Sequence, residues 1–287
     1  MAYMYFAKVN VNDEIFNVYD DPKVLQTLLV KLMGCINNST KIDLPKDKGI
    51  IKFITIEKDA GKMVVYGRLV KVFKDDIKVY DPKKDDVEDL PTDKLARSAT
   101  FFFDVEREIV AFTTGQYFGY KQFCSFFELL INACMGKSAF KVFLLKDEEL
   151  FKEKLKNFNK ITKINVIMIP KNPGRSDFEC MFANPEALSS TKARYYEQTF
   201  RADGKSEIGL SINNDYMDNT IDGVVNGYGD MTVEGIGVNA QKTRITSIAD
   251  APARMAIPNV EKNSIPAVVE RGIEGIVKVL AKIVRRG

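Results

Sequence analysis

The sequence predicts an α+β fold in which mixed or antiparallel sheets carry helices packed on one face, arranged in two lobes. The first observation behind this is that short alternating apolar segments, typical of strands, recur along the chain and amphipathic segments interrupt them. The second is the order strand, strand, helix, strand, helix, strand over residues 99–169. Helices that follow hairpins in this way typically cover a sheet face.

The first hundred residues read mainly as strands around one helix. Asp21 is a candidate N-cap and Pro22 fits the first turn of a helix over 21–36, in which leucines recur at helical spacing. Strand-like segments and the turns between them occupy the following ranges: strands 3–11, 50–58, 63–73 and 76–81; turns 59–61 and 74–76. We expect the acidic residues 81–93 to form a solvated connector, because their carboxylates lack calcium-loop spacing.

An aromatic run over residues 101–136 holds ten rings in thirty-six positions. It divides into two strands around the polar turn 104–108 and a helix that ends at Gly136, where a C-cap is expected. One apolar stripe runs along this helix: Phe123, Phe126, Phe127, Leu130, Ile131 and Cys134. Its helical spacing predicts a core packed under the hairpin, and an aromatic ligand pocket is the alternative.

A change in composition near residue 175 predicts a domain boundary. Residues 1–175 would form an α+β domain, with a strand at 140–145, a helix at 147–158 and a strand at 163–169. Residues 176–287 would form a smaller α+β domain that ends in a basic amphipathic helix. Within it we expect a helix over 184–200, then glycine-punctuated strands. Gly272 and Gly275 weaken the last helix, so it should be stabilised by docking, within the fold or across a dimer.

Composition excludes several chemistries. The chain of 287 residues has no histidine, so an imidazole base, a Ser–His couple and a His metal ligand are absent. The four cysteines form no CxxC pair, which makes a zinc site and a disulfide framework unexpected and predicts buried free thiols in the cytoplasm. We expect no cofactor, no signal peptide and no membrane-spanning helix. Two GKS segments, at 136–138 and 204–206, lack the spacing of a phosphate-binding loop.

Basic residues gather locally although the net charge is only +3. Residues 137–175 hold ten lysines and arginines against four acids, and the last helix ends without an acid. Lysines on one surface would contact phosphates without regard to base sequence, whereas a solvated helix or a helix-dipole effect is the simpler alternative. The candidate nucleic-acid-binding residues are Lys137, Lys141, Lys152, Lys156, Lys160, Lys163, Lys171, Arg175, Lys278, Lys282, Arg285 and Arg286.

The layout resembles that of the RexA-like phage-exclusion proteins and the KwaB proteins of the Kiwa defence system. The shared features are the chain length, the strand-rich first half, the hairpin, aromatic helix and strand over 101–145, and the basic terminal helix. No specific motif carries the resemblance, so it transfers no functional residue. It implies a cytoplasmic, homodimeric, DNA-binding protein of the conflict between phages and bacteria.

The leading hypothesis is a non-enzymatic protein that binds double-stranded DNA with weak sequence preference in phage defence or exclusion. A metal-dependent nuclease is the first alternative, with carboxylates that the sequence does not identify. The second alternative is a protein-interaction module of a defence complex, whose partner would be a second defence protein, membrane-bound or not.

Overall fold

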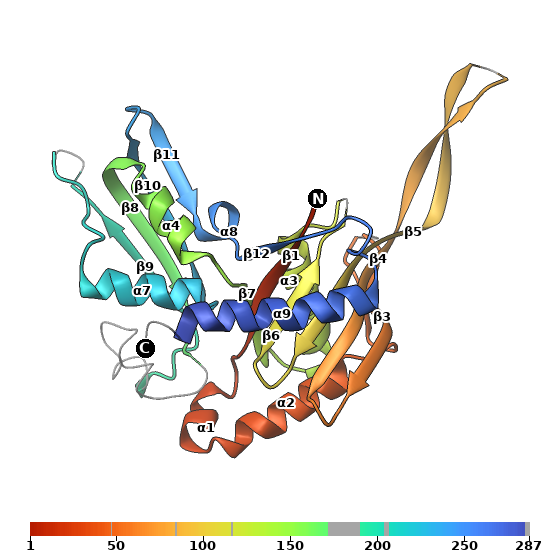
Figure 1. Ribbon diagram of the computed structural model, residues 1–287, viewed down its shortest axis with the longest axis horizontal. Coiled ribbons are helices and arrows are strands. Elements are labelled where there is room, and N and C mark those ends of the chain that lie inside the picture. Colours follow the sequence, from red (N-terminus) through yellow and green to blue (C-terminus); the bar gives the residue numbers. More distant parts are fainter. Residues whose placement is uncertain (47, 84, 116, 172–189, 204–206, 285–287) are drawn as a thin grey trace.

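The computed structural model describes residues 1–46, 48–83, 85–115, 117–171, 190–203 and 207–284. Its strands form two antiparallel sheets, one of eight strands and one of four, and helices pack against both (Figure 1). The predicted α+β fold with antiparallel sheets is confirmed. No helix in the described ranges is long and apolar enough to cross a membrane.

The large sheet has the strand order β12-β1-β6-β5-β4-β3-β2, and β7 pairs with β1 beyond the end of β12, on the edge opposite β6. Its strands are β1 (Ala2–Val11), β2 (Lys41–Asp43), β3 (Ile50–Asp59), β4 (Val64–Asp81), β5 (Asp86–Asp104), β6 (Ile109–Thr113), β7 (Phe140–Leu144) and β12 (Arg254–Ile257). The N-terminal strand β1 is central because it pairs with three other strands, one of them from near the C-terminus.

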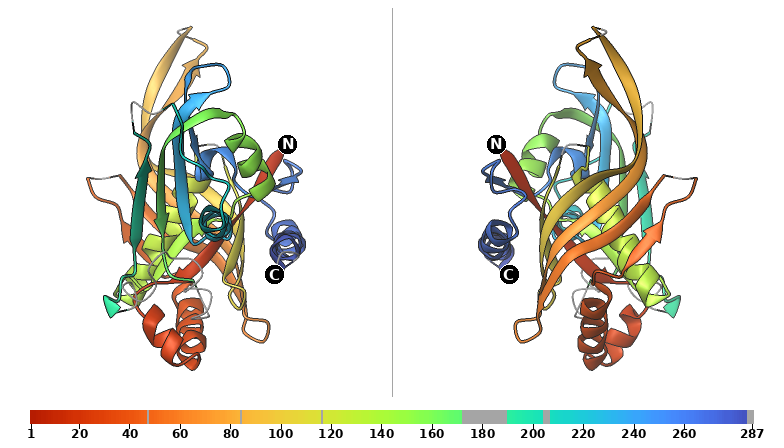
Figure 2. Two further views of the ribbon diagram at one scale, coloured as in Figure 1. Left: turned by 90° about the vertical axis from the view of Figure 1, so that its left-hand side faces the viewer. Right: turned by 90° about the vertical axis from the view of Figure 1, so that its right-hand side faces the viewer.

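Helices cover both faces of the large sheet (Figure 2). On one face lie α1 (Ile15–Asp20), α2 (Lys23–Cys35) and α3 (Tyr120–Met135), and on the other lies α9 (Ile265–Val284). Consecutive phenylalanines of β5 divide between the two cores, since side chains alternate along a strand. Phe101 and Phe103 pack under α3, whereas Phe102 packs under α9.

The aromatic run is core, as its spacing predicts. Phe123, Phe127 and Leu130 of α3 are fully buried, and Phe123 stacks on Phe112 of β6 with ring centroids 3.8 Å apart. Phe126 is only partly buried and lies edge-on to Phe118. Gly136 ends the helix in the left-handed conformation, with φ 69°, which glycine adopts without steric cost.

Helix α9 docks within the fold, as the weakening glycines predict. A Cβ at Gly275 would lie 2.4 Å from the Phe6 ring, and one at Gly272 would lie 2.9 Å from the Phe102 ring. The glycines therefore let the helix backbone approach the sheet closely. This contact offsets the low helix propensity of glycine, because it buries Val268 and Ile276 against the sheet.

The small sheet has the order β11-β10-β8-β9. Its strands are β8 (Phe158–Met168), β9 (Tyr196–Arg201), β10 (Gly229–Gly237) and β11 (Lys242–Thr246). Helices α4 (Glu148–Leu155) and α7 (Asp215–Val225) cover its inner face, and α8 (Ser247–Asp250) follows β11. Each sheet contains strands from both sides of residue 175, and the division into domains at that position stays a prediction.

Four expectations about local structure are wrong. Residues 74–76 do not form a turn but belong to β4, which has a bulge between Phe73 and Asp75. Most of the acidic segment 81–93, expected to be a connector, belongs to β5. Residues 196–200 form β9 instead of a helix, because Tyr196 and Phe200 alternate toward the small core. Helix α7 replaces a predicted strand region, and Asn214 caps it by accepting from the Met217 amide.

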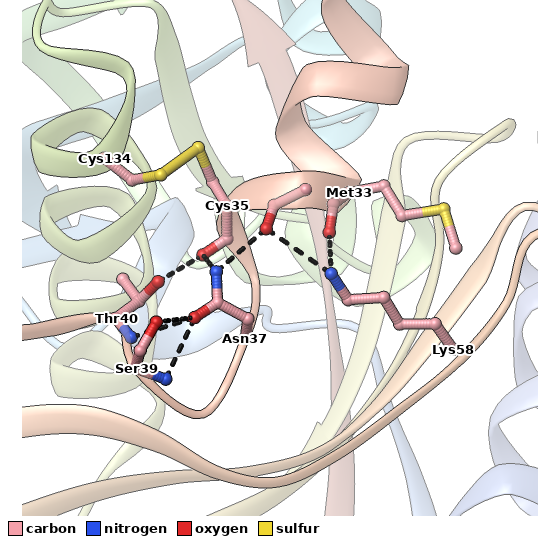
Figure 3. The surroundings of a disulfide bond; sticks show 8 residues. Met33, Cys35, Asn37, Ser39, Thr40, Lys58 and Cys134 are labelled. Carbon is pink, nitrogen blue, oxygen red and sulfur yellow. Dashed lines mark hydrogen bonds between the residues drawn. A yellow bond between two sulfur atoms is a disulfide. The ribbon is translucent and has the colours of Figure 1, made fainter.

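The expectation of four free thiols is also wrong. Cys35 at the end of α2 and Cys134 near the end of α3 form a disulfide, with Cα atoms 5.6 Å apart (Figure 3). Around it the Thr40 hydroxyl donates to the Cys35 carbonyl at 2.6 Å, and the Lys58 ammonium donates to the Met33 carbonyl. The packing of α2 beside α3 brings together two cysteines that are 99 positions apart, which sequence spacing does not reveal.

Candidate nucleic-acid interface

The candidate basic residues do not form one surface, and many are paired with carboxylates. Five of them, away from the small sheet's outer face, form these ion pairs: Lys137–Glu14, Lys141–Glu128 at 2.8 Å, Lys171–Asp222 at 3.4 Å, Lys278–Glu274 at 2.6 Å and Lys282–Asp147 at 3.2 Å. A paired lysine contributes less to phosphate binding, since its ion pair with the carboxylate must break before it can contact a phosphate. Arg175, Arg285 and Arg286 lie outside the described residues.

The remaining candidates, Lys152, Lys156, Lys160 and Lys163, gather where α4 ends and β8 begins. The first three line a groove of about 430 Å³ between this junction, residues 209–213 and α7. Lys152 is paired with Glu148 at 3.0 Å and with Asp218 at 3.4 Å. Among the residues that the structure describes, no carboxylate pairs with Lys156.

The outer face of the small sheet extends this positive charge across four strands. Arg201 of β9 pairs in register with Lys163 of β8, Lys163 with Glu234 of β10, and Glu234 with Arg244 of β11. Directly opposed residues project from the same sheet face, so these four side chains form one row. Glu234 contacts both Lys163, at 3.8 Å, and Arg244, at 3.6 Å.

A second row lies beside the first, nearer the start of β8. Ile236 of β10 is opposed by Lys160 of β8 and by Lys242 of β11. Ile236 is 39% exposed although it is a large aliphatic residue. We call the two rows together the basic sheet face; its members are Lys160, Lys163, Arg201, Glu234, Ile236, Lys242 and Arg244.

Five cations and one carboxylate therefore share an exposed surface. Lys163 and Arg201 are direct cross-strand neighbours, an arrangement of like charges that destabilises a sheet unless an anion lies nearby. Glu234 supplies one anion, for two of the cations. A polyanion laid across the strands would relieve the repulsion that remains, which gives this face the electrostatics of a phosphate-binding surface.

Three cations of the basic sheet face are not among the residues that the sequence analysis predicts: Arg201, Lys242 and Arg244. Arg201 follows a segment for which the sequence predicts a helix, so no strand pairing places it beside Lys163. Lys242 and Arg244 are separated by one residue in β11 and thus share a face. Alternation of basic residues in a strand is the signal that could have identified these two.

A separate hollow of about 230 Å³ lies between α9, β12 and the start of α4. Lys146 is buried at the floor of this hollow. Its ammonium contacts Asp230 at 2.7 Å and donates to the Gly229 carbonyl at 2.6 Å. At its rim Lys282 is paired with Asp147. Both lysines are therefore already paired with carboxylates.

Candidate metal ligands do not cluster in the described part of the chain. No three carboxylates or thiols there lie close enough to hold a metal ion. Cys124, the free cysteine among the described residues, is buried, and burial raises the pKa of its thiol well above the ordinary value. Its thiolate, the nucleophilic form, is therefore scarce at neutral pH. Cys180 lies outside the described residues.

The chain matches the protein family described as "Domain of unknown function (DUF4747)" over residues 14–270. This stretch includes the whole basic sheet face and both sheets apart from strand β1, which ends before residue 14. No curated protein matches the chain.

Proposed function

The chain belongs to the DUF4747 family, and from its structure we propose that it binds nucleic acid through phosphate contacts, with weak sequence preference. The observation that carries this proposal is the alignment of five cations on one exposed sheet face. Lys156 and the groove beside it extend the same surface around the start of β8.

The chemistry of the face favours backbone contact over base recognition. Lysine ammonium and arginine guanidinium groups neutralise phosphates, and release of counterions then makes affinity fall steeply with salt. Base-specific recognition of single strands typically uses exposed aromatic rings that stack on bases. The aromatic residues of strands β8 to β11 are Phe158, Tyr196 and Phe200, and all three pack against the small core.

Double-stranded DNA is the ligand we propose first. A smooth duplex offers regularly spaced phosphates to a rigid row of cations, and the resemblance to phage-exclusion and defence proteins implies DNA as well. A role in phage defence, a homodimer and a cytoplasmic location belong to the same proposal. Disulfides are rare in reducing compartments, so the oxidation state of Cys35 and Cys134 in cells would test the location.

A salt titration of DNA binding tests the function. We compare the wild type with the triple variant Lys163→Ala, Arg201→Ala, Arg244→Ala by fluorescence anisotropy. The variant should bind every duplex more weakly by a similar factor. The slope of log affinity against log salt should flatten by about 0.9 for each phosphate that the variant no longer neutralises.

The matched control removes the same charge elsewhere. Lys137, Lys141 and Lys278 are ion-paired and lie away from the face, so their replacement by alanine should leave the slope nearly unchanged. An equal decrease in affinity for both triple variants would show that net charge, and not this face, determines binding. Absence of binding by the wild type at low salt would reject the proposal altogether.

A further inference from the structure

The outer halves of β4 and β5 form a two-stranded hairpin that projects from the large sheet (Figure 1). Strand β3 pairs with β4 only as far as Val72, and β6 pairs with β5 only from Phe101 onward. Between these limits, residues 75–81 and 86–92 pair with each other, and no other described strand joins them. We call residues 74–95 the acidic hairpin.

Its exposed surface combines apolar side chains with carboxylates. Tyr80 and Val87 are direct cross-strand partners, so they share one face, and they are 57% and 53% exposed. Eight acidic and five basic residues lie within residues 74–95. A two-stranded hairpin is marginally stable in water by itself, and exposed apolar residues on such an element indicate a docking surface.

Charge decides what such a hairpin can bind. A second acidic hairpin would be repelled, whereas a basic surface with an apolar centre would be complementary. The basic sheet face has this composition, with Ile236 exposed between Lys160 and Lys242. Tyr80 and Val87 would contact Ile236, and the exposed Asp85 in the turn would pair with the surrounding cations. Asp86, also exposed, projects from the other face of the hairpin and adds to the negative charge of its tip.

Within one chain the two surfaces lie far apart. The acidic hairpin and the small sheet occupy opposite ends of the long axis of the molecule (Figure 1). We propose that the acidic hairpin docks on the basic sheet face of a second copy of this chain. Two such contacts close into a dimer when each copy supplies one hairpin and one face.

This interface does not require nucleic acid, although it uses the face assigned to phosphate binding. The hairpin carboxylates occupy the positions of phosphates, so docking and DNA binding exclude each other on that face. The docked dimer is therefore the form of the homodimer without DNA, and DNA would displace the hairpin. Dimerisation is therefore tested without nucleic acid. The chain can dimerise in this way without binding DNA, and it can bind DNA without dimerising in this way, so the two tests have separate outcomes.

The experiment is a charge exchange read by sedimentation velocity at low salt. The full chain should form dimers. A hairpin-reversed variant, Asp85→Lys with Asp86→Lys, and a face-reversed variant, Lys163→Glu with Arg244→Glu, should each dissociate at least about tenfold more readily, because both contacts become repulsive. An equimolar mixture of the two variants should dimerise again, since each hairpin then meets a face of opposite charge.

The control variant, Glu106→Lys with Glu270→Lys, makes the same change in charge at exposed sites away from both surfaces and should remain dimeric. Recovery in the mixture also shows that both reversed chains are folded. A monomeric wild type, a dimeric hairpin-reversed variant, or a mixture that stays monomeric would each overturn the inference.

Discussion

The two sheets differ in what covers their faces. The large sheet is buried on both sides, by α2 and α3 on one face and by α9 on the other. The small sheet is covered on one side by α4 and α7, while its other side carries exposed charged residues. The large sheet therefore serves mainly as a rigid frame, and the small sheet presents a surface that can contact another molecule.

Neighbouring residues within one strand of each sheet show this contrast. Phe101, Phe102 and Phe103 in β5 are all buried, as expected for a strand between two apolar layers. In β8, buried Ile164 stands between Lys163 and Asn165, the alternation typical of a half-exposed strand. Substitutions in β5 should therefore change stability, and substitutions on the outer face of β8 should change binding to another molecule.

The largest effect is expected from Phe127→Ala in the large-sheet core. Phe127 is fully buried against Phe53, Phe101 and Phe103, so truncation should lower the free energy of unfolding by about 3–5 kcal/mol. Urea denaturation measures it. Phe126→Ala is the matched control and should cost clearly less, because Phe126 is only partly buried. An equal destabilisation by both substitutions would contradict the assigned packing.

Removal of the disulfide should have the next largest effect. The Cys35–Cys134 bond constrains a long loop of the unfolded chain, so Cys134→Ser should lower stability by roughly 2–4 kcal/mol. A reducing agent should destabilise the wild type by a similar amount and leave the variant unchanged. A wild type that is indifferent to reductant would show that the bond is not formed in solution.

A smaller effect should follow from Gly275→Ala in α9. The new methyl group would meet the Phe6 ring, so we expect a destabilisation of about 1–3 kcal/mol despite the better helix propensity of alanine. Gly34→Ala in α2 is the control, because a Cβ there meets nothing within 4 Å, and it should stabilise the protein by about 0.5–1 kcal/mol. Thermal unfolding of both variants checks the signs. A more stable Gly275→Ala variant would show that α9 does not pack closely on the large sheet.

The smallest effect on stability is expected for Arg244→Ala on the basic sheet face. Arg244 is exposed and contacts Glu234 at 3.6 Å, so the change should stay within about 0.5 kcal/mol. Denaturation measures what Arg244 contributes to stability, and DNA titration of the same preparation measures what it contributes to binding. A large decrease in stability would make Arg244 part of the frame instead of the contact surface.

The core of the large sheet can be predicted from the sequence because local spacing determines it. Phe123, Phe127 and Leu130 follow one helical stripe, and the hairpin over 101–113 has a polar turn at the expected place. The full length of β4 and β5 does not follow in this way, because Asp75 and Pro91 resemble turn residues. Cross-strand pairing overrides that local preference, even in the outer half of the hairpin.

The candidate site can be predicted only in part, since it depends on pairing between distant strands. Local charge identifies Lys160 and Lys163, but Arg201 and Arg244 join them only because β9 and β10 pair with β8, far from it in sequence, and β11 pairs with β10. Local charge also cannot reveal which lysines are neutralised. Lys141 and Lys278 are equal candidates by sequence, and both are paired with glutamates.

The central claim, that the outer face of the small sheet is the phosphate-binding surface, is tested most directly by mapping lysine reactivity with and without duplex DNA. Amine acylation followed by mass spectrometry reports each lysine separately. DNA should protect Lys156, Lys160, Lys163 and Lys242 and leave the ion-paired Lys137 and Lys278 unchanged. Protection centred on Lys278, or none on the small sheet while DNA is bound, would contradict the account.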